Sequence, residues 1–462
     1  MTVNDNNSNP EKTAILLAVV FSTFITAFMG SSINLAIPAI GTEFNADVIL
    51  LGWIVKVYLL VSTIFLVPFG RLGDIYGRKK VFLSGMIIIT VSSLLSSLSF
   101  DIYSLLVFRI FQGIGSSMIF ATAMAIVTSV FQIEERGKAL GFIVASGYAG
   151  LSFGPFAGGL FTEYLGWRSI FVFPVLLGCM GICYVMRKIK SEWTEARDES
   201  FDLRGSILYG LALLLLMFGL TRIPGVWGFI LLASGAGGLT LFVFYQLRNP
   251  SPVIQLDMFR KNKVFAFSNL ATIINYSATF AIAFLLSLYL QYIKDYTPRD
   301  AGMILVSQPV IMALVSPLAG RLSDRIEPRI LATVGMAITT IGLFCLIFVD
   351  NMNIRGIILT LILIGIGFGF FSSPNNNAIM SSVHKRHYGV ASGTMGTMRL
   401  LGQTFSMGIV MLVFSLLFGR ELFTEGKTQD FLLTVQVAFI LLSAICFFGI
   451  FVSYARGNIH SS

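Results

Sequence analysis

Long apolar runs recur along the whole chain, and they constrain its fold more than any other feature. We count fourteen such runs in the 462 residues, each close to the roughly 20 residues that a spanning helix needs. The chain is 55% hydrophobic and 12% charged, with a mean hydropathy of +0.83. A compact soluble body could not bury that much apolar surface, and the runs lack the alternation of a membrane β-barrel. The sequence therefore predicts an all-α membrane protein.

The charges between the runs predict one orientation. The runs cover residues 13–36, 49–69, 80–99, 103–130, 138–161, 167–187, 204–222, 226–247, 264–292, 300–319, 329–349, 355–380, 388–418 and 431–455. An even number of spans places both termini on one side of the membrane. If that side is the cytoplasm, inner segments hold about three times as many Lys and Arg residues as outer segments, as the positive-inside rule requires. The net charge of +9 is then a property of membrane-facing loops, and we expect no nucleic-acid partner.

Other patterns exclude further classes of protein. Residues 1–12 are polar and lack the features of a signal peptide. The four cysteines lie inside apolar runs, so we interpret them as packing residues and not as a disulfide framework. No metal-binding, phosphate-binding or nucleophile motif is present, so we expect no cofactor, no metal site and no enzymatic activity. A membrane-embedded enzyme is the main alternative from another class.

An internal repeat divides the chain. GRLGD at 70–74 returns as GRLSD at 320–324, and RGKALG at 136–141 matches HYGVASG at 387–393 at nearly the same offset. The repeat predicts two homologous six-helix bundles, residues 1–187 and 264–462. The linker and the two runs within 188–263 have no counterpart, so we predict an inserted two-helix hairpin. Duplicated membrane halves hold a site between them and expose it to each side in turn as they rock.

Four motifs refine this picture. The loop GRLGDIYGRKK at 70–80 combines turn-forming glycines with an acid that can meet a helix end. RIFQGIG at 109–115 places an arginine inside a run, and SSINLAIPAI at 31–40 closes the first run. GYAGLSFGPFAGG at 147–159 carries glycines three and four positions apart, which form a stripe for close helix contact.

In this order and on these helices, the motifs resemble the major facilitator superfamily, in particular its fourteen-helix drug:proton antiporter branch. The resemblance implies two pseudo-symmetric six-helix bundles plus the hairpin, and secondary transport of the multidrug efflux type. It implies a cytoplasmic gate at Gly70, Asp74, Gly77, Arg78, Asp324 and Arg325. It also implies an exporter-type seam on which the bundles slide, at Gly150, Gly154, Pro155 and Gly158.

The chain departs from this branch in one position. The branch usually carries an Asp near the middle of the first helix, where this chain has Met29. No acidic residue lies deep inside a run, whereas Lys56, Arg109 and Arg399 do. One reading is a positive cavity for an anion or a polar neutral molecule. The other is a lipophilic substrate with proton coupling at Glu163, Asp74 or elsewhere, while Lys56 and Arg109 snorkel to the interface.

Polar residues within the runs are the candidates for the substrate and coupling cavity, because such groups are costly in a membrane without partners. The candidates are Asn34, Lys56, Arg109, Gln112, Asn275, Gln308, Asn376 and Arg399. The amides at 375–377 after Pro374 either line the cavity or cap a broken helix. Tyr289 and Tyr292 either line it or belong to an interfacial aromatic belt.

These observations lead to one expected function and one alternative. We expect export of small amphiphilic compounds or drugs by alternating access with proton antiport. The alternative is an exporter or exchanger of an anionic or polar metabolite through the positive cavity. We expect a monomer in the lipid bilayer of the cell membrane, with both termini in the cytoplasm and with protons and a small molecule as its partners.

Overall fold

The computed structural model describes residues 9–195, 201–220, 222–223, 225–249, 257–323, 325–383, 388–419 and 427–457. Within these residues thirteen helices are long and apolar enough to cross a membrane. The helix α5 (Ile133–Leu165) occupies the position of the remaining predicted run and packs beside α1. The fold class is therefore confirmed as an all-helical membrane protein. The predicted domain limits of 1–187, 188–263 and 264–462 stay a prediction.

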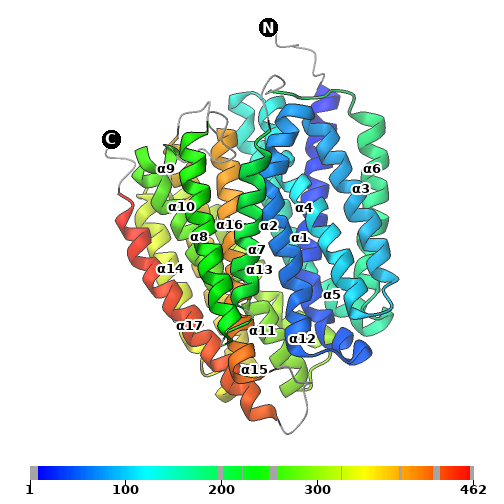
Figure 1. Ribbon diagram of the computed structural model, residues 1–462, viewed down its shortest axis with the longest axis vertical. Coiled ribbons are helices and arrows are strands. Elements are labelled where there is room, and N and C mark those ends of the chain that lie inside the picture. The colour runs from blue at the N-terminus through cyan, green and yellow to red at the C-terminus, as the bar shows by residue number, and fades with distance from the viewer. Residues whose placement is uncertain are drawn as a thin grey trace.

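Two groups of helices stand side by side, and a further pair of helices lies in front of their junction in Figure 1, with one helix of the pair in contact with both groups. The first bundle contains α1 (Asn9–Phe44), α2 (Val48–Tyr76), α3 (Arg78–Ser97), α4 (Ile102–Val130), α5 and α6 (Ser169–Lys188). The inserted hairpin contains α7 (Leu203–Leu220) and α8 (Val226–Arg248), followed by the short α9 (Asp257–Lys261). In Figure 1 the start of α1 and the end of α17 lie at the same end of the molecule.

The second bundle has more interruptions than the first. It contains α10 (Lys263–Thr279), α11 (Ile282–Leu288), the π-helix η1 (Tyr289–Ile293), α12 (Pro298–Leu305), α13 (Ser307–Ser323), α14 (Pro328–Leu346), the short η2 (Val349–Asn351), α15 (Ile354–Ser381), α16 (Tyr388–Leu417) and α17 (Thr428–Ala455). The predicted runs 264–292 and 300–319 are therefore each divided. Pro309 lacks the N–H that would continue the helix across Val306. At the other break, the Ala281 N–H donates to the Ser406 hydroxyl of α16 at 3.0 Å.

Polar residues outside the apolar runs begin several helices. The Asp47 carboxylate accepts from the Leu50 N–H at 2.7 Å at the start of α2. Asp101 does the same for Ser104 at the start of α4, where the Ser104 hydroxyl also contacts the Asp101 N–H in a capping box. Such caps satisfy N–H groups that have no partner within the helix. These acids therefore define where the spanning helices begin.

Candidate functional site

The two bundles touch along the halves of their facing helices at the end of the molecule that the charge pattern predicts to face outward, which we call the outer side. The Ser287 hydroxyl of α11 donates to the Asn34 carbonyl oxygen of α1 at 2.6 Å. The helices α5 and α12 are also in close contact, because a Cβ added to Gly302 would lie 2.3 Å from the Pro155 carbonyl oxygen. A side chain at Gly302 would force these helices apart. The outer side is therefore closed between the bundles in this conformation.

The middle of α1 is less closely packed at one glycine than the outer closure is. Gly30 lies one turn before Asn34 on the same helix face. It is half-buried, and a Cβ built on it would meet no atom within 4 Å. The Asn34 side chain on that face is buried, and its Oδ1 accepts no hydrogen bond. This predicted cavity residue therefore carries an unpaired amide oxygen at the inner edge of the outer closure.

Polar and aromatic side chains from both bundles meet at mid-depth. The hydroxyls of Tyr148 on α5 and Ser372 on α15 share a hydrogen bond of 3.0 Å. The Arg399 guanidinium of α16 lies 5.5 Å from the ring centre of Tyr276 on α10. Phe368 packs edge-on against the same ring, with 5.2 Å between the ring centres. We call Tyr148, Tyr276, Phe368, Ser372 and Arg399 the central cluster.

The central cluster carries unused hydrogen-bonding capacity and a positive charge. Arg399 lies about 16 Å along α16 from its start at 1.5 Å per residue, and its side chain is half-buried. Its buried Nε donates no hydrogen bond, and none of the ion pairs among the described residues includes it. Buried polar atoms normally have partners, so this guanidinium is suited to bind a polar or anionic group between the bundles.

Arg109 and Gln112 lie inside the first bundle and not between the bundles. The Arg109 Nε donates to the Ile54 carbonyl oxygen at 3.0 Å, and Nη1 donates to Gln112 Oε1 at 2.8 Å. The guanidinium also lies 4.4 Å from the ring centre of Tyr58. Both predicted cavity residues are 0% exposed, so neither cavity lining nor snorkelling describes Arg109 here.

The glycines of the RIFQGIG motif explain how an arginine reaches the bundle centre. A Cβ added to Gly113 would lie 2.8 Å from the Tyr58 carbonyl oxygen of α2. Gly85 of α3 and Gly115 of α4 have the same relation, with each Cβ 2.8 Å from the other's carbonyl oxygen. The helix α4 therefore fits closely between α2 and α3, and the Arg109 side chain reaches the Ile54 carbonyl oxygen there.

Lys56 is fully buried and faces the inserted hairpin. Its Nζ donates to the Met217 carbonyl oxygen of α7 at 2.8 Å and lies 4.5 Å from the Trp53 ring centre. The side chain is 0% exposed, so it does not snorkel outward. Of the three basic residues predicted for a positive cavity, only Arg399 therefore belongs to the central cluster.

The loop at 70–80 ties together the helix ends of the first bundle on the side predicted to be cytoplasmic. The Arg78 guanidinium bonds to the Asp74 carboxylate, with its Nη2 2.7 Å from Oδ1, and to the Glu195 carboxylate at 2.7 Å. It also donates to the Ala125 carbonyl oxygen of α4 at 3.1 Å. Gly77 has a φ of 120°, a conformation that favours glycine. The predicted gate residues Asp74, Gly77 and Arg78 thus form one cluster, which joins α2, α3 and α4 to the segment after α6.

The other gate candidates contribute less to this cluster. A Cβ at Gly70 would meet only the Ala121 side chain, at 3.8 Å. Arg325 is exposed at the turn before α14. Asp324 lies outside the described residues, so its predicted role in the second gate stays a prediction.

The second bundle contains a buried arginine that sequence analysis missed. It ties helix ends together on the same side of the molecule as the Arg78 cluster. Arg456, directly after α17, is 0% exposed. It donates to Asn375 Oδ1 at 2.7 Å and to the Pro328 carbonyl oxygen at 2.9 Å. Asn375 lies 250 positions after Ala125, the spacing of the repeated loop motif. Each bundle therefore holds a guanidinium at the cytoplasmic end of its fourth span, but from a different helix.

The amides near Pro374 belong to a continuous helix. The helix α15 runs through Pro374 to Ser381, so the broken-helix alternative is wrong. The amides of Asn375 and Asn377 find partners on neighbouring helices, at Thr272 Oγ1 and Ser323 Oγ, both at 2.9 Å. Cross-helix bonds of this kind compensate for the polar groups.

The remaining predicted cavity residues differ in their surroundings. Asn275 is 0% exposed, and neither polar atom of its amide has a partner. Gln308 and Asn376 are half-buried. Tyr289 is 0% exposed and donates to the Val349 carbonyl oxygen at 3.1 Å. The Tyr289 side chain therefore packs inside the second bundle and does not belong to an exposed aromatic belt.

The glycine stripe of α5 packs inside the first bundle. A Cβ at Gly150 would lie 2.6 Å from the Phe24 carbonyl oxygen, and one at Gly158 would lie 2.9 Å from the Ser32 carbonyl oxygen. A Cβ at Gly154 would lie 3.0 Å from the Ser32 backbone nitrogen, which is also on α1. The expectation that these glycines form a sliding seam between the bundles is therefore wrong.

A different face of α5 meets the second bundle. A Cβ at Gly159 would lie 2.5 Å from the Pro298 carbonyl oxygen of α12. The Pro155 carbonyl oxygen of α5 approaches Gly302, which is also on α12, as described above. The interface between bundles is therefore formed by Pro155 and Gly159, next to the predicted stripe. Pro155 is thus the one predicted seam residue at this interface.

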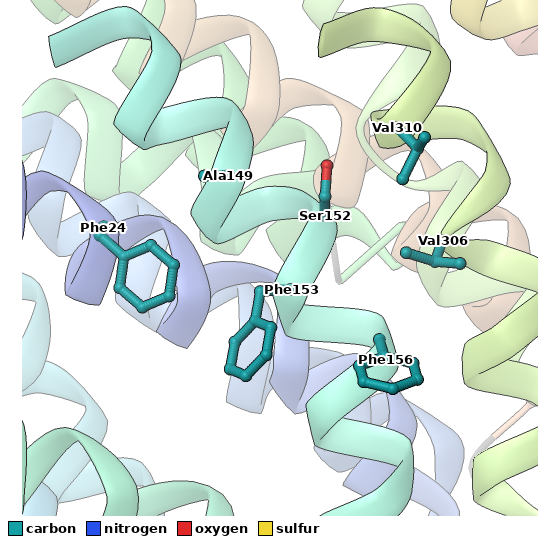
Figure 2. Close-up of a pocket in the computed structure, with 7 residues that line it drawn as sticks. All are labelled: Phe24, Ala149, Ser152, Phe153, Phe156, Val306 and Val310. Carbon is teal, nitrogen blue, oxygen red and sulfur yellow. The ribbon is translucent and has the colours of Figure 1, made fainter. Parts of the chain in front are cut away.

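An apolar groove lies between α5 and α13, close to this interface (Figure 2). Its volume is about 360 Å³, and its lining residues are Phe24, Ala149, Ser152, Phe153, Phe156, Val306 and Val310. Phe156 and Val310 are exposed at its edge, at 42% and 39%. In a membrane this edge faces lipid.

The chain matches known transporters along its whole length. The family model described as Major Facilitator Superfamily matches residues 19–407 and 268–458. The riboflavin transporter RibZ of Clostridioides difficile is 30% identical, over 95% of this chain and 96% of its own length. The multidrug resistance protein Stp of Mycobacterium tuberculosis is 29% identical, over 85% of this chain and 73% of its own length. The cephamycin export protein CmcT of Amycolatopsis lactamdurans is 29% identical, over 89% and 87%.

The fold is also found among solved structures, of which we describe one example. It is a bacterial homologue of the human lysosomal transporter Spinster in an inward-facing and unoccupied conformation. It aligns with a TM-score of 0.67 at 14% identity, over 97% of this chain and 98% of that one. At that identity the similarity concerns the fold alone.

Proposed function

The chain belongs to the major facilitator superfamily, and from that premise we propose that it exports small amphiphilic compounds by alternating access in exchange for protons. Membership makes the chain a multi-pass secondary transporter and not an enzyme. The observation that supports the proposed substrate class is the central cluster. It combines aromatic faces, hydroxyls and one guanidinium between the two bundles.

The chemistry of the central cluster suits a ring compound with polar substituents. Tyr276 and Phe368 offer aromatic surface, which packs against flat apolar groups. The Tyr148 and Ser372 hydroxyls and the Arg399 Nε offer hydrogen bonds. The relatives named for riboflavin transport and cephamycin export support compounds of this kind.

A second candidate is an exporter or exchanger of an anionic or polar metabolite. It is favoured by the Arg399 charge, which no carboxylate among the described residues offsets. Lys56 and Arg109 no longer support it, because their side chains are buried in other contacts. Of the three basic residues proposed for a positive cavity, Arg399 alone still supports this candidate.

Transport into everted membrane vesicles tests the proposed function. Vesicles with the protein are compared with vesicles without it, using riboflavin as a neutral probe, ethidium as a cation and fluorescein as an anion. We expect accumulation of riboflavin that needs an acidic interior and stops when a protonophore collapses the pH gradient. Accumulation that is indifferent to the gradient would contradict proton antiport.

The Arg399→Gln variant separates the two candidate substrate classes. We expect fluorescein transport to fall about tenfold or more, as for the loss of one charged contact of about 1.5–3 kcal/mol, and riboflavin transport to fall less. The matched control is Arg355→Gln at an exposed arginine of α15, which we expect to keep both activities. Equal losses for both probes in Arg399→Gln would argue against an anion-selective contact.

Proton coupling has two candidate carboxylates. Asp74 lies in the Arg78 cluster, and Glu163 lies near the outer end of α5. The proposed coupling predicts that Asp74→Asn or Glu163→Gln uncouples riboflavin movement from the pH gradient while downhill movement continues. Two variants that keep gradient-driven accumulation would show that coupling uses another group.

We also propose that the protein acts as a monomer in the cell membrane with both termini in the cytoplasm. The supporting observation is the excess of Lys and Arg in the segments on that side. Thiol labelling of cysteines introduced at Tyr76 and Phe100, on opposite sides of the predicted membrane, tests the orientation. Equal reaction with an impermeant reagent in intact cells would contradict it.

A further inference from the structure

The inserted hairpin contacts both bundles, but not in the same way. The helix α7 follows α2 over most of its length, since Gly210 packs on Ile64 and the rings of Phe218 and Trp53 lie 4.9 Å apart. Tyr209 OH also donates to the Thr63 carbonyl oxygen at 3.4 Å. The helix α8 packs on α7 and is drawn in front of the second bundle in Figure 1.

The polar contact of greatest consequence in this pair is made by Lys56. Its Nζ donates to the Met217 carbonyl oxygen, so a fully buried amine of the first bundle depends on the hairpin for its hydrogen-bond partner. If α7 moved away from α2, this amine would lose that partner inside the membrane. Such a loss is costly, so the contact opposes separation of the hairpin from the first bundle.

Contact with the second bundle includes the outer part of α7, while Leu401 and Phe405 of α16 pack on the apolar cluster that α7 shares with α2. A Cβ at Gly408 of α16 would lie 2.9 Å from Leu220 Cδ1. The Ser415 hydroxyl donates to the carbonyl oxygen of Ile223, in the turn after α7, at 3.3 Å. Neither contact involves a charged group. Both lie toward the end of the molecule where Ser287 and Asn34 join the bundles.

We propose that the hairpin moves as part of the first bundle and that its contact with α16 belongs to the outer closure. When the outer side opens, α16 slides away from Leu220 and Ile223, while Lys56 and Tyr209 keep α7 on α2. The hairpin is then a third closing contact on the outer side. The inference depends on the rocking of two bundles and not on which compound is carried.

Two engineered disulfides in the full-length protein test this assignment. Gly210→Cys with Ile64→Cys locks the hairpin to α2, and Gly408→Cys with Leu220→Cys locks it to α16. A Cβ built on Gly210 would lie 2.8 Å from Ile64 Cγ2, and one built on Gly408 would lie 2.9 Å from Leu220 Cδ1. Both of those side chains are themselves replaced, which removes the clash, and formation of each bridge is verified by mass spectrometry before labelling. The reduced form of each variant is its own control.

The readout is opening of the outer side, so it needs no identified substrate. Ser287→Cys, added to each variant, is labelled from outside with an impermeant maleimide, and peptide mapping separates its label from that of the native cysteines. We expect the α16 lock to lower the labelling rate at least about tenfold by removing the open state, and the α2 lock to leave it within about twofold. Riboflavin transport is measured in parallel.

Every other pattern of results overturns the assignment. Slow labelling only with the α2 lock would place the hairpin with the second bundle. Slow labelling with both locks would mean that the hairpin separates from α2 and from α16 during opening. Fast labelling with both locks would mean that the hairpin takes no part in opening. If the reduced Gly210 variant fails to fold, Trp53→Cys with Phe218→Cys replaces it. A correct labelling pattern without riboflavin transport would refute the proposed substrate and not the hairpin assignment.

Discussion

Replacing Gly150 by Ala tests whether the α5 stripe is a packing surface inside the first bundle. The added Cβ would lie 2.6 Å from the Phe24 carbonyl oxygen, 2.8 Å from Ala27 Cβ and 3.1 Å from the Phe28 nitrogen. Two of these three atoms belong to the backbone of α1, which cannot rotate away as a flexible side chain can. The two helices must therefore separate, and the contacts of the whole stripe are weakened.

Two opposing effects give the size of the expected change. Overpacking of this kind costs about 1–3 kcal/mol, whereas Gly to Ala inside a helix gains about 0.5–1 kcal/mol. Gly147→Ala on the same helix is the matched control, because its Cβ would meet only Thr23 Cγ2 at 3.8 Å. That variant keeps the helix gain without the clash. We expect the unfolding free energies of the two variants to differ by about 1–3 kcal/mol, with Gly150→Ala less stable.

The assay is unfolding of the purified proteins in detergent, followed by tryptophan fluorescence, together with vesicle transport. Gly150→Ala should unfold earlier than wild type and transport more slowly, while Gly147→Ala should match or exceed the stability of wild type. If the two variants unfold together, the close approach of α1 and α5 does not limit stability. The assignment of the stripe to the first bundle would then lose its energetic support.

Three further substitutions probe the buried arginines and the loop at 70–80. Arg109→Met removes the hydrogen bond to the Ile54 carbonyl oxygen and leaves the buried Gln112 Oε1 without its donor. We expect a loss of about 1–3 kcal/mol, read from detergent unfolding with Arg355→Met as the unchanged control. Arg456→Met should destabilise the second bundle to a similar extent, and an unchanged unfolding midpoint would contradict its role. Asp74→Asn should cost less than about 1 kcal/mol, because the carboxylate is 30% exposed. It should nevertheless slow transport, and full activity would argue against a gate.

The motifs pointed to residues that make unusual contacts, but they did not predict the partners of those residues. The loop residues Asp74 and Arg78 do meet, as the charge pattern indicated. Arg109 was recognised as unusual, but its partners include the Ile54 carbonyl oxygen, which no side-chain pattern reveals. Arg456 was missed because it directly follows the last apolar run, where a basic residue is ordinary. A better signal would have been the Asn375 amide at the equivalent end of α15, which needs a partner.

The sequence by itself determined the number of spans, their orientation relative to one another and the doubled architecture. The length of an apolar run and the charge of a loop are local properties, and they set which segments span the membrane and in which direction. Which face of each helix meets which neighbour was decided only by the tertiary structure. The Gly150 stripe and the neighbouring Gly159 lie on one helix, yet they meet α1 and α12 respectively. Lipid and neighbouring helices are both apolar, so the faces of a membrane helix differ little in composition. Close packing in three dimensions therefore decides which helix each face contacts.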